Sequence, residues 1–197
     1  MSYSIIVVIA LGVALGRFGL PSSFFSYTGW VIDLGLCLLL FLVGIEIGFN
    51  KESLTRVKKI GFKLILIPIM IILGSILGSI LGGIVIGMEY NEAGAVGAGL
   101  GWYSLSSVLL SSYSTELAAL AFMSNVIREI IAFISIPLIV KYIGDLESIA
   151  PAGATAMDTS LPIITKATNA SISIIAFVTG VILSSAVPVL VPILINL

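Results

Sequence analysis

The sequence contains no histidine and only one cysteine, Cys37, among its 197 residues. Without an imidazole or a second thiol, the chain cannot assemble a Ser-His-Asp triad, a histidine zinc site or an internal disulfide. Charged residues are also scarce, at 10% of the chain against roughly 25% in soluble domains. The net charge of -1 provides no basic field for nucleic acid. We therefore expect neither an enzyme nor a nucleic-acid-binding protein, and no organic cofactor or metal site.

Hydrophobic residues, by contrast, make up 59% of the chain, and the mean hydropathy is +1.24. Such a composition indicates that lipid is the solvent, and a bilayer core of about 30 Å requires roughly 20 apolar residues of helix. The sequence predicts an all-α, polytopic integral membrane protein. Five apolar runs predict long transmembrane helices, at about residues 3–20, 29–49, 61–88, 115–141 and 170–197. The first run lacks the charged start and cleavage site of a signal peptide.

Two weaker segments are rich in Gly, Ala, Ser and Thr: segment A, at about residues 93–112, and segment B, at about 148–167. This composition is typical of broken or re-entrant helices buried in protein, although tightly packed ordinary helices have it too. Segment A contains Gly97–Leu105 and segment B contains Gly153–Leu161, and both match G-A-x-x-x-x-x-S-L at an offset of 56 residues. The repeats are inverted if the segments are re-entrant, which we favour, and parallel if they span.

Adding the same offset of 56 to the helix at 115–141 gives positions in the last helix, at about 170–197. We therefore expect two units: a three-helix N-terminal unit at residues 1–90 and a transport core at 91–197. The core would consist of two segment-plus-helix repeats, 91–146 and 147–197. Paired interrupted segments at corresponding places in two repeats indicate the binding site of a transporter.

The orientation follows from one basic loop, because basic loops face the cytoplasm. Five of the nine basic residues lie between the second and third helices: Lys51, Arg56, Lys58, Lys59 and Lys63. This places the N-terminus in the cytoplasm and the C-terminus outside. If segment A is re-entrant, Lys141 also lies in the cytoplasm.

Three charged residues fall near the middle of the membrane: Arg128 and Glu129 in the helix at 115–141, and Asp158 in segment B. An Asp or Arg at a helix centre costs about 2.5–3.5 kcal/mol on insertion scales, so such residues require a reason. Asn125 shares a helix face with Glu129 at i+4 and with Arg128 at i+3. In one interpretation Arg128 pairs with Glu129 or Asp158 and fastens the helix to segment B. In the favoured one, two carboxylates and one guanidinium form a net negative pocket that holds a cation or exchanges a proton.

Further candidate ligands lie in the broken segments. Trp102 and Tyr103 have aromatic faces that suit an aliphatic chain or an ammonium group. Ser104, Thr159 and Ser160 carry hydroxyls, although in membrane helices such groups more often bond to their own backbone.

The helix at 61–88 carries a double stripe of small residues. Gly74, Gly78 and Gly82 repeat at i+4, and Ser75, Ser79 and Gly83 repeat beside them. This pattern is typical of close helix packing, either within the chain or with a second subunit.

Several of these runs together resemble the lysine exporter LysO family. The resemblance extends over nearly the whole chain, in the runs Leu39–Ile45, Gly101–Ser106, Arg128–Ile130, Gly153–Asp158 and Leu161–Pro162. It implies an inner-membrane carrier that exports L-lysine and toxic analogues such as thialysine. The carrier's two acidic membrane residues would fall on Glu129 and Asp158.

We expect export by exchange with protons or another monovalent cation, with H+ or Na+ as the coupling ion. Glu129 and Asp158 would bind the ammonium groups or that ion alternately, and Arg128 would hold the substrate carboxylate or balance Glu129. Bacterial family members are longer, with extra hydrophobic helices before the region that this chain matches. We therefore expect a homodimer, or pairing with a separate small membrane subunit.

Other functions stay open. An ion-coupled carrier of another small solute, such as an organic anion, would use Arg128 for recognition. A non-transporting membrane subunit would only stabilise a partner. An intramembrane protease is disfavoured because histidine and the usual protease motifs are missing.

Overall fold

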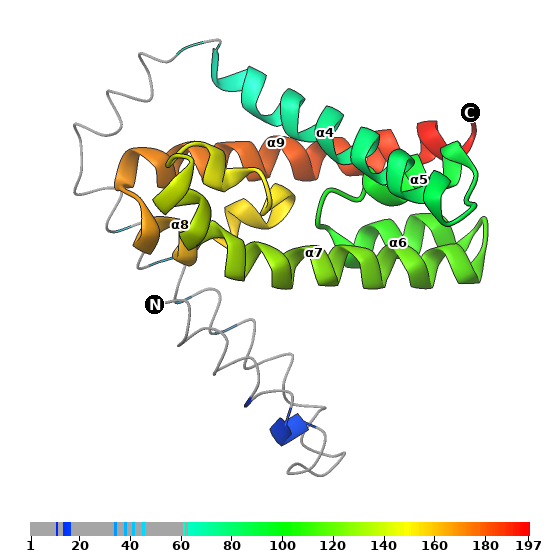
Figure 1. The fold of residues 1–197 in the computed structure, drawn as a ribbon, viewed down its shortest axis with the longest axis horizontal. Helices are drawn as coiled ribbons and strands as arrows, with labels where there is room; N and C mark the ends of the chain where they lie inside the picture. Colours follow the sequence, from blue (N-terminus) through cyan, green and yellow to red (C-terminus); the bar gives the residue numbers. More distant parts are fainter. Residues whose placement is uncertain are drawn as a thin grey trace.

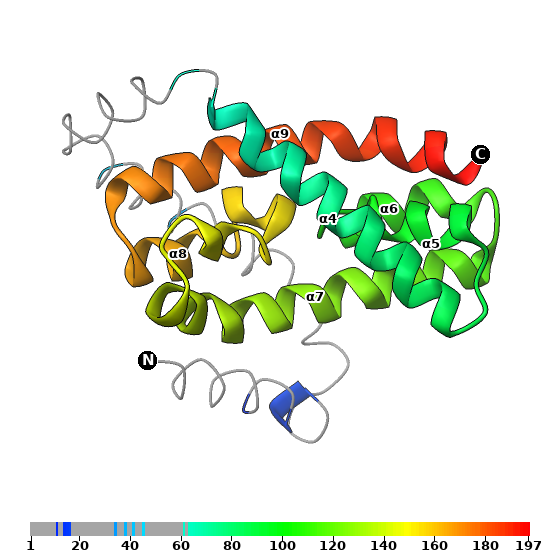
Figure 2. The same cartoon turned by 45° about the horizontal axis from the view of Figure 1, so that its top comes forward.

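The computed structural model describes residues 63–197 continuously, together with residues 11, 14–16, 34, 38, 41, 45 and 61. The helices expected at about 3–20 and 29–49 lie largely outside the described residues, as does most of the basic loop. In the described part, every element is helical, as Figures 1 and 2 show.

Three long helices frame this part of the chain: α4 (Lys63–Val85), α7 (Thr115–Tyr142) and α9 (Ala170–Ile195). At a rise of 1.5 Å per residue, even the shortest is about 34 Å long, which suffices for an apolar core of about 30 Å. All three are long and apolar enough to cross a membrane. They confirm the all-helical membrane fold and the long helices expected at about 61–88, 115–141 and 170–197.

Side-chain caps explain where two of these helices begin. The hydroxyl of Ser114 accepts a hydrogen bond from the Leu117 N–H at 3.3 Å. The side-chain oxygen of Asn169 accepts from the N–H groups of Ser171 and Ile172 at 3.1 and 3.3 Å. These bonds satisfy backbone donors that the first turn of a helix leaves without partners.

Segments A and B are both broken helices. Segment A consists of α5 (Tyr90–Gly97) and α6 (Tyr103–Ser111). Segment B consists of the short 3-10 helices η2 (Glu147–Ile149) and η3 (Gly153–Met157), followed by α8 (Leu161–Ala167). Each segment returns to the end of the bundle from which it started, as Figures 1 and 2 show.

Hydrogen bonds fix which end each segment occupies. The side chains of Asp145 and Asn169, which flank segment B, are bonded to each other at 3.2 Å. At the opposite end of the bundle, Asn91 in segment A donates to the Ile195 carbonyl near the end of α9 at 3.3 Å. The two segments therefore enter the bundle from opposite ends.

The tips of the two segments touch in the middle of the bundle. The Ala154 N–H donates to the Leu100 carbonyl at 2.8 Å. Leu100, Gly101 and Gly153 adopt left-handed backbone conformations, with φ values of 50°, 102° and 62°. A side chain on Gly153 would overlap the Leu100 carbonyl oxygen, so glycine at this position lets the two backbones meet.

The element boundaries follow the offset of 56 residues. It carries Tyr103 and Thr115, where α6 and α7 begin, to Thr159 and Ser171, within two residues of the starts of α8 and α9. α7 and α9 run in opposite directions in Figure 1. The first halves of the segments differ, because segment B has 3-10 turns where segment A has the helix α5. Because α7 and α9 run in opposite directions and the segments enter from opposite ends, the two copies have an inverted arrangement.

The double small-residue stripe on α4 divides into two faces. On one face, Ser75 and Ser79 donate to the carbonyls of Gly97 and Ala93 in α5 at 2.8 and 2.6 Å. A side chain on Gly83 would overlap Ala93. The other face, with Gly74, Gly78 and Gly82, has open space around it in the described part of the chain. Only one half of the stripe is therefore used within these residues.

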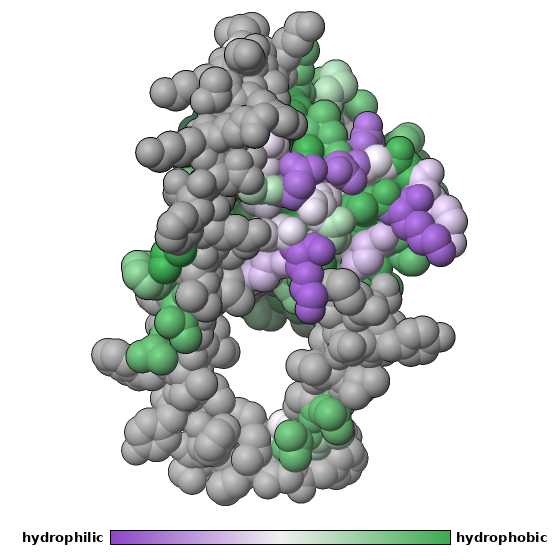
Figure 3. Space-filling model, turned by 90° about the vertical axis from the view of Figure 1, so that its left-hand side faces the viewer, coloured by the Kyte–Doolittle hydropathy of each residue, from purple (hydrophilic) through white to green (hydrophobic). Residues whose placement is uncertain are grey.

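Polar side chains gather at the end of the bundle where α7 ends and α9 begins, with hydrophobic surface around them (Figure 3). α4 begins at this end with Lys63, and Lys141 and Lys166 lie in the last turns of α7 and α8. Glu89, Glu92 and Glu116 lie at the opposite end, where α5 and α7 begin. The described lysines thus share one end of the bundle.

Candidate functional site

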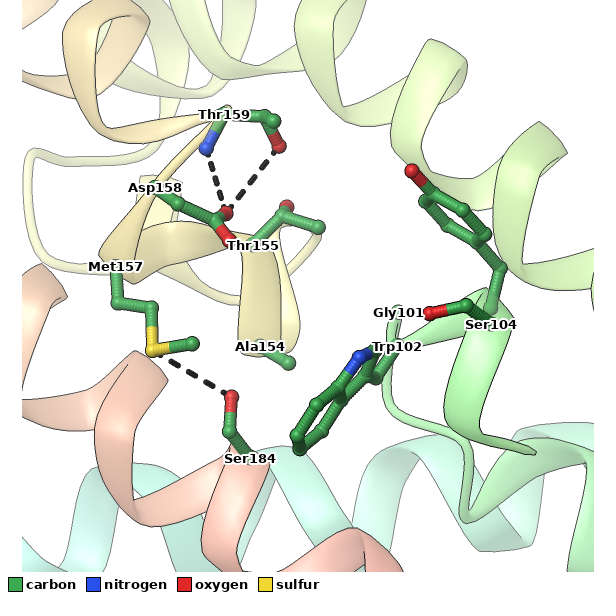
Figure 4. Close-up of a pocket in the computed structure, with 10 residues that line it drawn as sticks. Gly101, Trp102, Ser104, Ala154, Thr155, Met157, Asp158, Thr159 and Ser184 are labelled. Atoms are coloured by element: carbon green, nitrogen blue, oxygen red, sulfur yellow. Dashed lines mark hydrogen bonds between the residues drawn. The ribbon is translucent and has the colours of Figure 1, made fainter. Parts of the chain in front are cut away.

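A small pocket of about 110 Å³ lies between the tips of segments A and B, closed on one side by α9 (Figure 4). Trp102, Tyr103 and Ser104 contribute from segment A, and Asp158 and Thr159 from segment B. The other lining residues are Gly101, Ala154, Thr155, Met157 and Ser184. Because a cavity needs about 10–15 Å³ of such volume to hold one water, the pocket has room for several waters, an ion or one end of a small solute.

Corresponding positions of the two repeats meet in this pocket. The offset of 56 residues pairs Gly101 with Met157, Trp102 with Asp158, and Tyr103 with Thr159, and all six residues line it. The pocket therefore lies on the approximate symmetry between the repeats, which is where carriers built from inverted repeats bind their substrates.

Glu129 and Asp158 meet at Thr159. The Thr159 hydroxyl donates to Glu129 Oε1 and lies 3.4 Å from Asp158 Oδ1. The Thr159 N–H also donates to Asp158 Oδ1, at 2.6 Å. One hydroxyl has one proton, so it satisfies only one carboxylate at a time. Both acids are half-buried, and a cation or a proton between them would offset their repulsion.

Arg128 does not join these acids. Its Nε donates to the Pro151 carbonyl at 3.1 Å, its Nη1 to the Ser75 hydroxyl at 2.8 Å and its Nη2 to the Ala150 carbonyl at 3.3 Å. Arg128 borders a separate cavity of about 530 Å³ beside α4. The interpretation in which Arg128 pairs with Glu129 or Asp158 is thus wrong for the described part of the chain. The reason is that consecutive residues on a helix point about 100° apart.

Two other expected ligands lie behind the pocket. Asn125 is 3% exposed; its Oδ1 accepts from the Gly101 N–H at 2.7 Å, and its Nδ2 donates to the Ala121 carbonyl at 2.9 Å. Ser160 is fully buried, and its hydroxyl bonds to that of Thr155 at 2.7 Å. Both side chains therefore stabilise the bends of the broken segments and are absent from the pocket lining.

The aromatic residues of segment A occupy different positions. Trp102 is 37% exposed at the pocket, near Ser184 and Ala154 in Figure 4. The Tyr103 ring packs edge-on against Phe122, with 5.4 Å between the ring centroids. The indole face is thus available to a solute, while the phenol is partly held by α7.

Sequence reasoning did not identify Met157 and Ser184. The Ser184 hydroxyl lies 3.6 Å from Met157 Sδ across the pocket. The repeat held a signal for Ser184, which is the counterpart of the candidate residue Arg128 at the offset of 56, but none for Met157, the counterpart of Gly101. Within the described residues, no group of three His, Cys, Asp or Glu side chains is placed to bind a metal ion.

Comparisons with known proteins agree on one family. The family model described as "Lysine exporter LysO" matches residues 6–195. Lysine exporter LysO of Escherichia coli (strain K12) is 30% identical over 185 residues, which cover 93% of this chain and 60% of that protein. A Haemophilus influenzae protein whose name carries the words lysine exporter is 31% identical over 156 residues, which cover 79% of each chain. No solved structure matches the chain.

Proposed function

Because the chain belongs to the lysine exporter LysO family, we propose that it exports L-lysine, and analogues such as thialysine, across the cytoplasmic membrane. The observation that carries the proposal is the pocket between the segment tips, where Asp158 and, through Thr159, Glu129 meet without a cationic partner among the described residues. A net negative site in a membrane protein favours a cationic solute. The chain spans 60% of the length of its E. coli relative.

The pocket chemistry suits an ammonium group on an aliphatic chain. Asp158 and Glu129 accept hydrogen bonds from the ammonium, and these charge-assisted bonds are about twice as strong as neutral ones. The Trp102 face offers a cation–π contact and an apolar surface for the methylene chain. Tyr103, Ser104 and Thr159, which also line the pocket, carry hydroxyls.

The paired acids also suggest how transport is driven. When lysine leaves, two carboxylates stay behind in a half-buried site, and protons or Na+ then take the place of the ammonium. Since the same acids bind either lysine or the coupling ion, the two exclude each other. This is the requirement for an exchanger, and H+ or another monovalent cation is the coupling ion that we propose.

The lysines support an orientation. Lys63, Lys141 and Lys166 belong to one end of the bundle, which the positive-inside rule assigns to the cytoplasm. Segment A then enters from outside and segment B from the cytoplasm, both as re-entrant hairpins, and the C-terminus lies outside with the N-terminus in the cytoplasm. Two opposed hairpins that meet at the site provide one gate toward each side of the membrane.

One face of α4 supports pairing with another subunit. Among the described residues, nothing lies within 4 Å of the side-chain positions of Gly74, Gly78 and Gly82, and such stripes permit close helix contacts in membranes. We infer a homodimer, or pairing with a separate small membrane subunit. Size measurement in detergent tests this, and a strict monomer would refute it.

Counterflow of labelled lysine into proteoliposomes, across a series of pH and Na+ concentrations, tests the function. Wild-type protein should show lysine-dependent flux, while Glu129→Gln and Asp158→Asn should reduce it to the background. Glu116→Gln is the matched control, because Glu116 lies exposed in the first turn of the same helix. Retained flux in both acid variants would refute the site. Competition by carboxylates but not by lysine would favour an organic anion, and no flux from pure protein would favour a non-transporting subunit.

A further inference from the structure

The centre of α7 holds the breaks of both segments. Asn125 bonds to the Gly101 N–H in segment A. Arg128, three residues further along α7, bonds to the Ala150 and Pro151 carbonyls in segment B. Both side chains satisfy backbone groups that the breaks expose.

The Ala150 and Pro151 carbonyls lack their usual donors because the chain bends after them. In a continuous helix the Ala154 N–H would donate to the Ala150 carbonyl, four residues before it. Here Gly153 turns the backbone with φ 62°, and the Ala154 N–H donates to Leu100 of segment A instead. The Arg128 guanidinium takes the place of the missing donors, as basic side chains do at the ends of helices.

Arg128 also reaches segment A, through α4. Its Nη1 donates to the Ser75 hydroxyl at 2.8 Å, and that hydroxyl donates to the Gly97 carbonyl at 2.8 Å. Gly97 and Gly153 occupy equivalent places in the repeated motif. We call Arg128, Ser75 and the carbonyls of Gly97, Ala150 and Pro151 the Arg128 network.

We propose that Arg128 is a positioning residue: through the Arg128 network it fixes the two broken segments relative to each other, and it does not contact the transported solute. The network holds each of the two segments just before the contact between Leu100 and Ala154. The pocket residues Trp102 and Asp158 come just after that contact in their segments. The proposal rests on the proposed function, since its consequence is the geometry of the lysine pocket.

The acceptors distinguish this role from recognition of a substrate carboxylate. All three partners of Arg128 are neutral oxygens: the Ser75 hydroxyl on α4 and two adjacent carbonyls of segment B. A role in positioning requires donors in the right places. A role in recognition requires the positive charge to face the substrate carboxylate.

The test compares lysine with lysinamide, which keeps both amino groups but has no carboxylate charge. Arg128→Met should raise the apparent KM for lysine in counterflow about tenfold or more, and raise the lysinamide concentration needed for half-inhibition by the same factor. Arg128→Lys, which keeps three donors on a long side chain, should restore part of the affinity for both compounds. A rise for lysine alone would overturn the proposal, because it would show that Arg128 binds the carboxylate.

Ser75→Ala provides the second variant, because it breaks the network without removing a charge. It should raise the KM for lysine and the half-inhibition value for lysinamide by equal factors. Ser79→Ala is the matched control: Ser79 makes the same type of bond from α4 to α5, but outside the Arg128 network, so its KM should stay at the wild-type value. A wild-type KM in Ser75→Ala would overturn the proposal.

The proposed function and the positioning role of Arg128 can be refuted independently of each other. If the wild-type protein transports no lysine, the proposed function fails, and thermal unfolding in detergent then tests the Arg128 network by itself. Non-additive shifts of the unfolding midpoint in Arg128→Met, Ser75→Ala and the double variant support the coupling. Additive shifts overturn it.

Discussion

Arg128 and Glu129 are neighbours in the sequence, yet their side chains bond to different sides of α7. The guanidinium bonds to Ser75 of α4 and to carbonyls that precede the tip of segment B. The carboxylate accepts from Thr159, which follows that tip. One turn of α7 therefore contacts segment B on both sides of its break, so a movement of that segment must alter one contact or the other.

Thr159 should prove important for binding because its hydroxyl lies between the two carboxylates. Thr159→Val keeps the shape but removes the donor. A hydrogen bond to a charged group contributes about 1.5–3 kcal/mol, so the apparent Kd for lysine should rise at least about tenfold. Thr159→Ser should bind like the wild type. Equilibrium binding of labelled lysine to purified protein measures both. An unchanged Kd in Thr159→Val would show that the hydroxyl does not matter.

Asn125 should matter for stability more than for recognition. Asn125→Ala leaves the buried Gly101 N–H without its acceptor, which costs about 1–3 kcal/mol. The midpoint of thermal unfolding in detergent should fall accordingly. Asn196→Ala, which removes an exposed bond to the Pro192 carbonyl, should leave the midpoint nearly unchanged. Equal shifts in the two variants would contradict this assignment.

The long helices and the two acids could be predicted from the sequence for the same reason. A run of about 20 apolar residues has few structures available in lipid, and a carboxylate at mid-membrane is expensive enough to require a function. The expectation of two broken segments rested on composition and on the motif that begins at Gly97 and Gly153. The structure places both segments inside the bundle with their tips in contact.

The roles of Arg128 and Ser160 could not be predicted in this way. Arg128 is long enough to reach partners on several sides, and the Ala150 carbonyl is free to accept from it because the Ala154 N–H bonds to the other segment. Ser160 and Thr155 satisfy each other in the interior, which no local pattern encodes. A contact between distant residues decided the first case, and the bend between Thr155 and Ser160 decided the second.

Thr179 offers a test of the interior of α9. Its side chain is fully buried, and its hydroxyl has no hydrogen-bond partner in the described part of the chain. Thr179→Val has the same shape and removes an unsatisfied polar group, so the free energy of unfolding should rise by about 1 kcal/mol. Thr155→Val should have the opposite effect, since that hydroxyl donates to the Ala152 carbonyl at 2.9 Å. Thermal unfolding in detergent measures both, and a loss of stability in Thr179→Val would show that the hydroxyl has a partner.

Glycine substitutions provide the sharpest test of the contact between the tips of the two segments. Gly153 has φ 62°, and a side chain there would overlap the Leu100 carbonyl oxygen and approach Arg128 Nη2 to 3.0 Å. A left-handed conformation costs other residues about 1–2 kcal/mol, and the overlap requires the tips to separate as well. Gly153→Ala should therefore lower the free energy of unfolding by about 3 kcal/mol and abolish lysine counterflow.

Gly94→Ala is the control, because Gly94 lies inside α5 and its missing side chain would meet Ile80 and Leu194 only at ordinary van der Waals distances of 3.5 and 3.7 Å. Alanine favours a helix by about 0.5–1 kcal/mol over glycine, so this variant should be as stable as the wild type or slightly more so. If Gly153→Ala kept both its unfolding midpoint and its lysine flux, the two tips would not be in contact in the working protein. In that case the pocket between them could not be the site at which the two halves of the carrier meet.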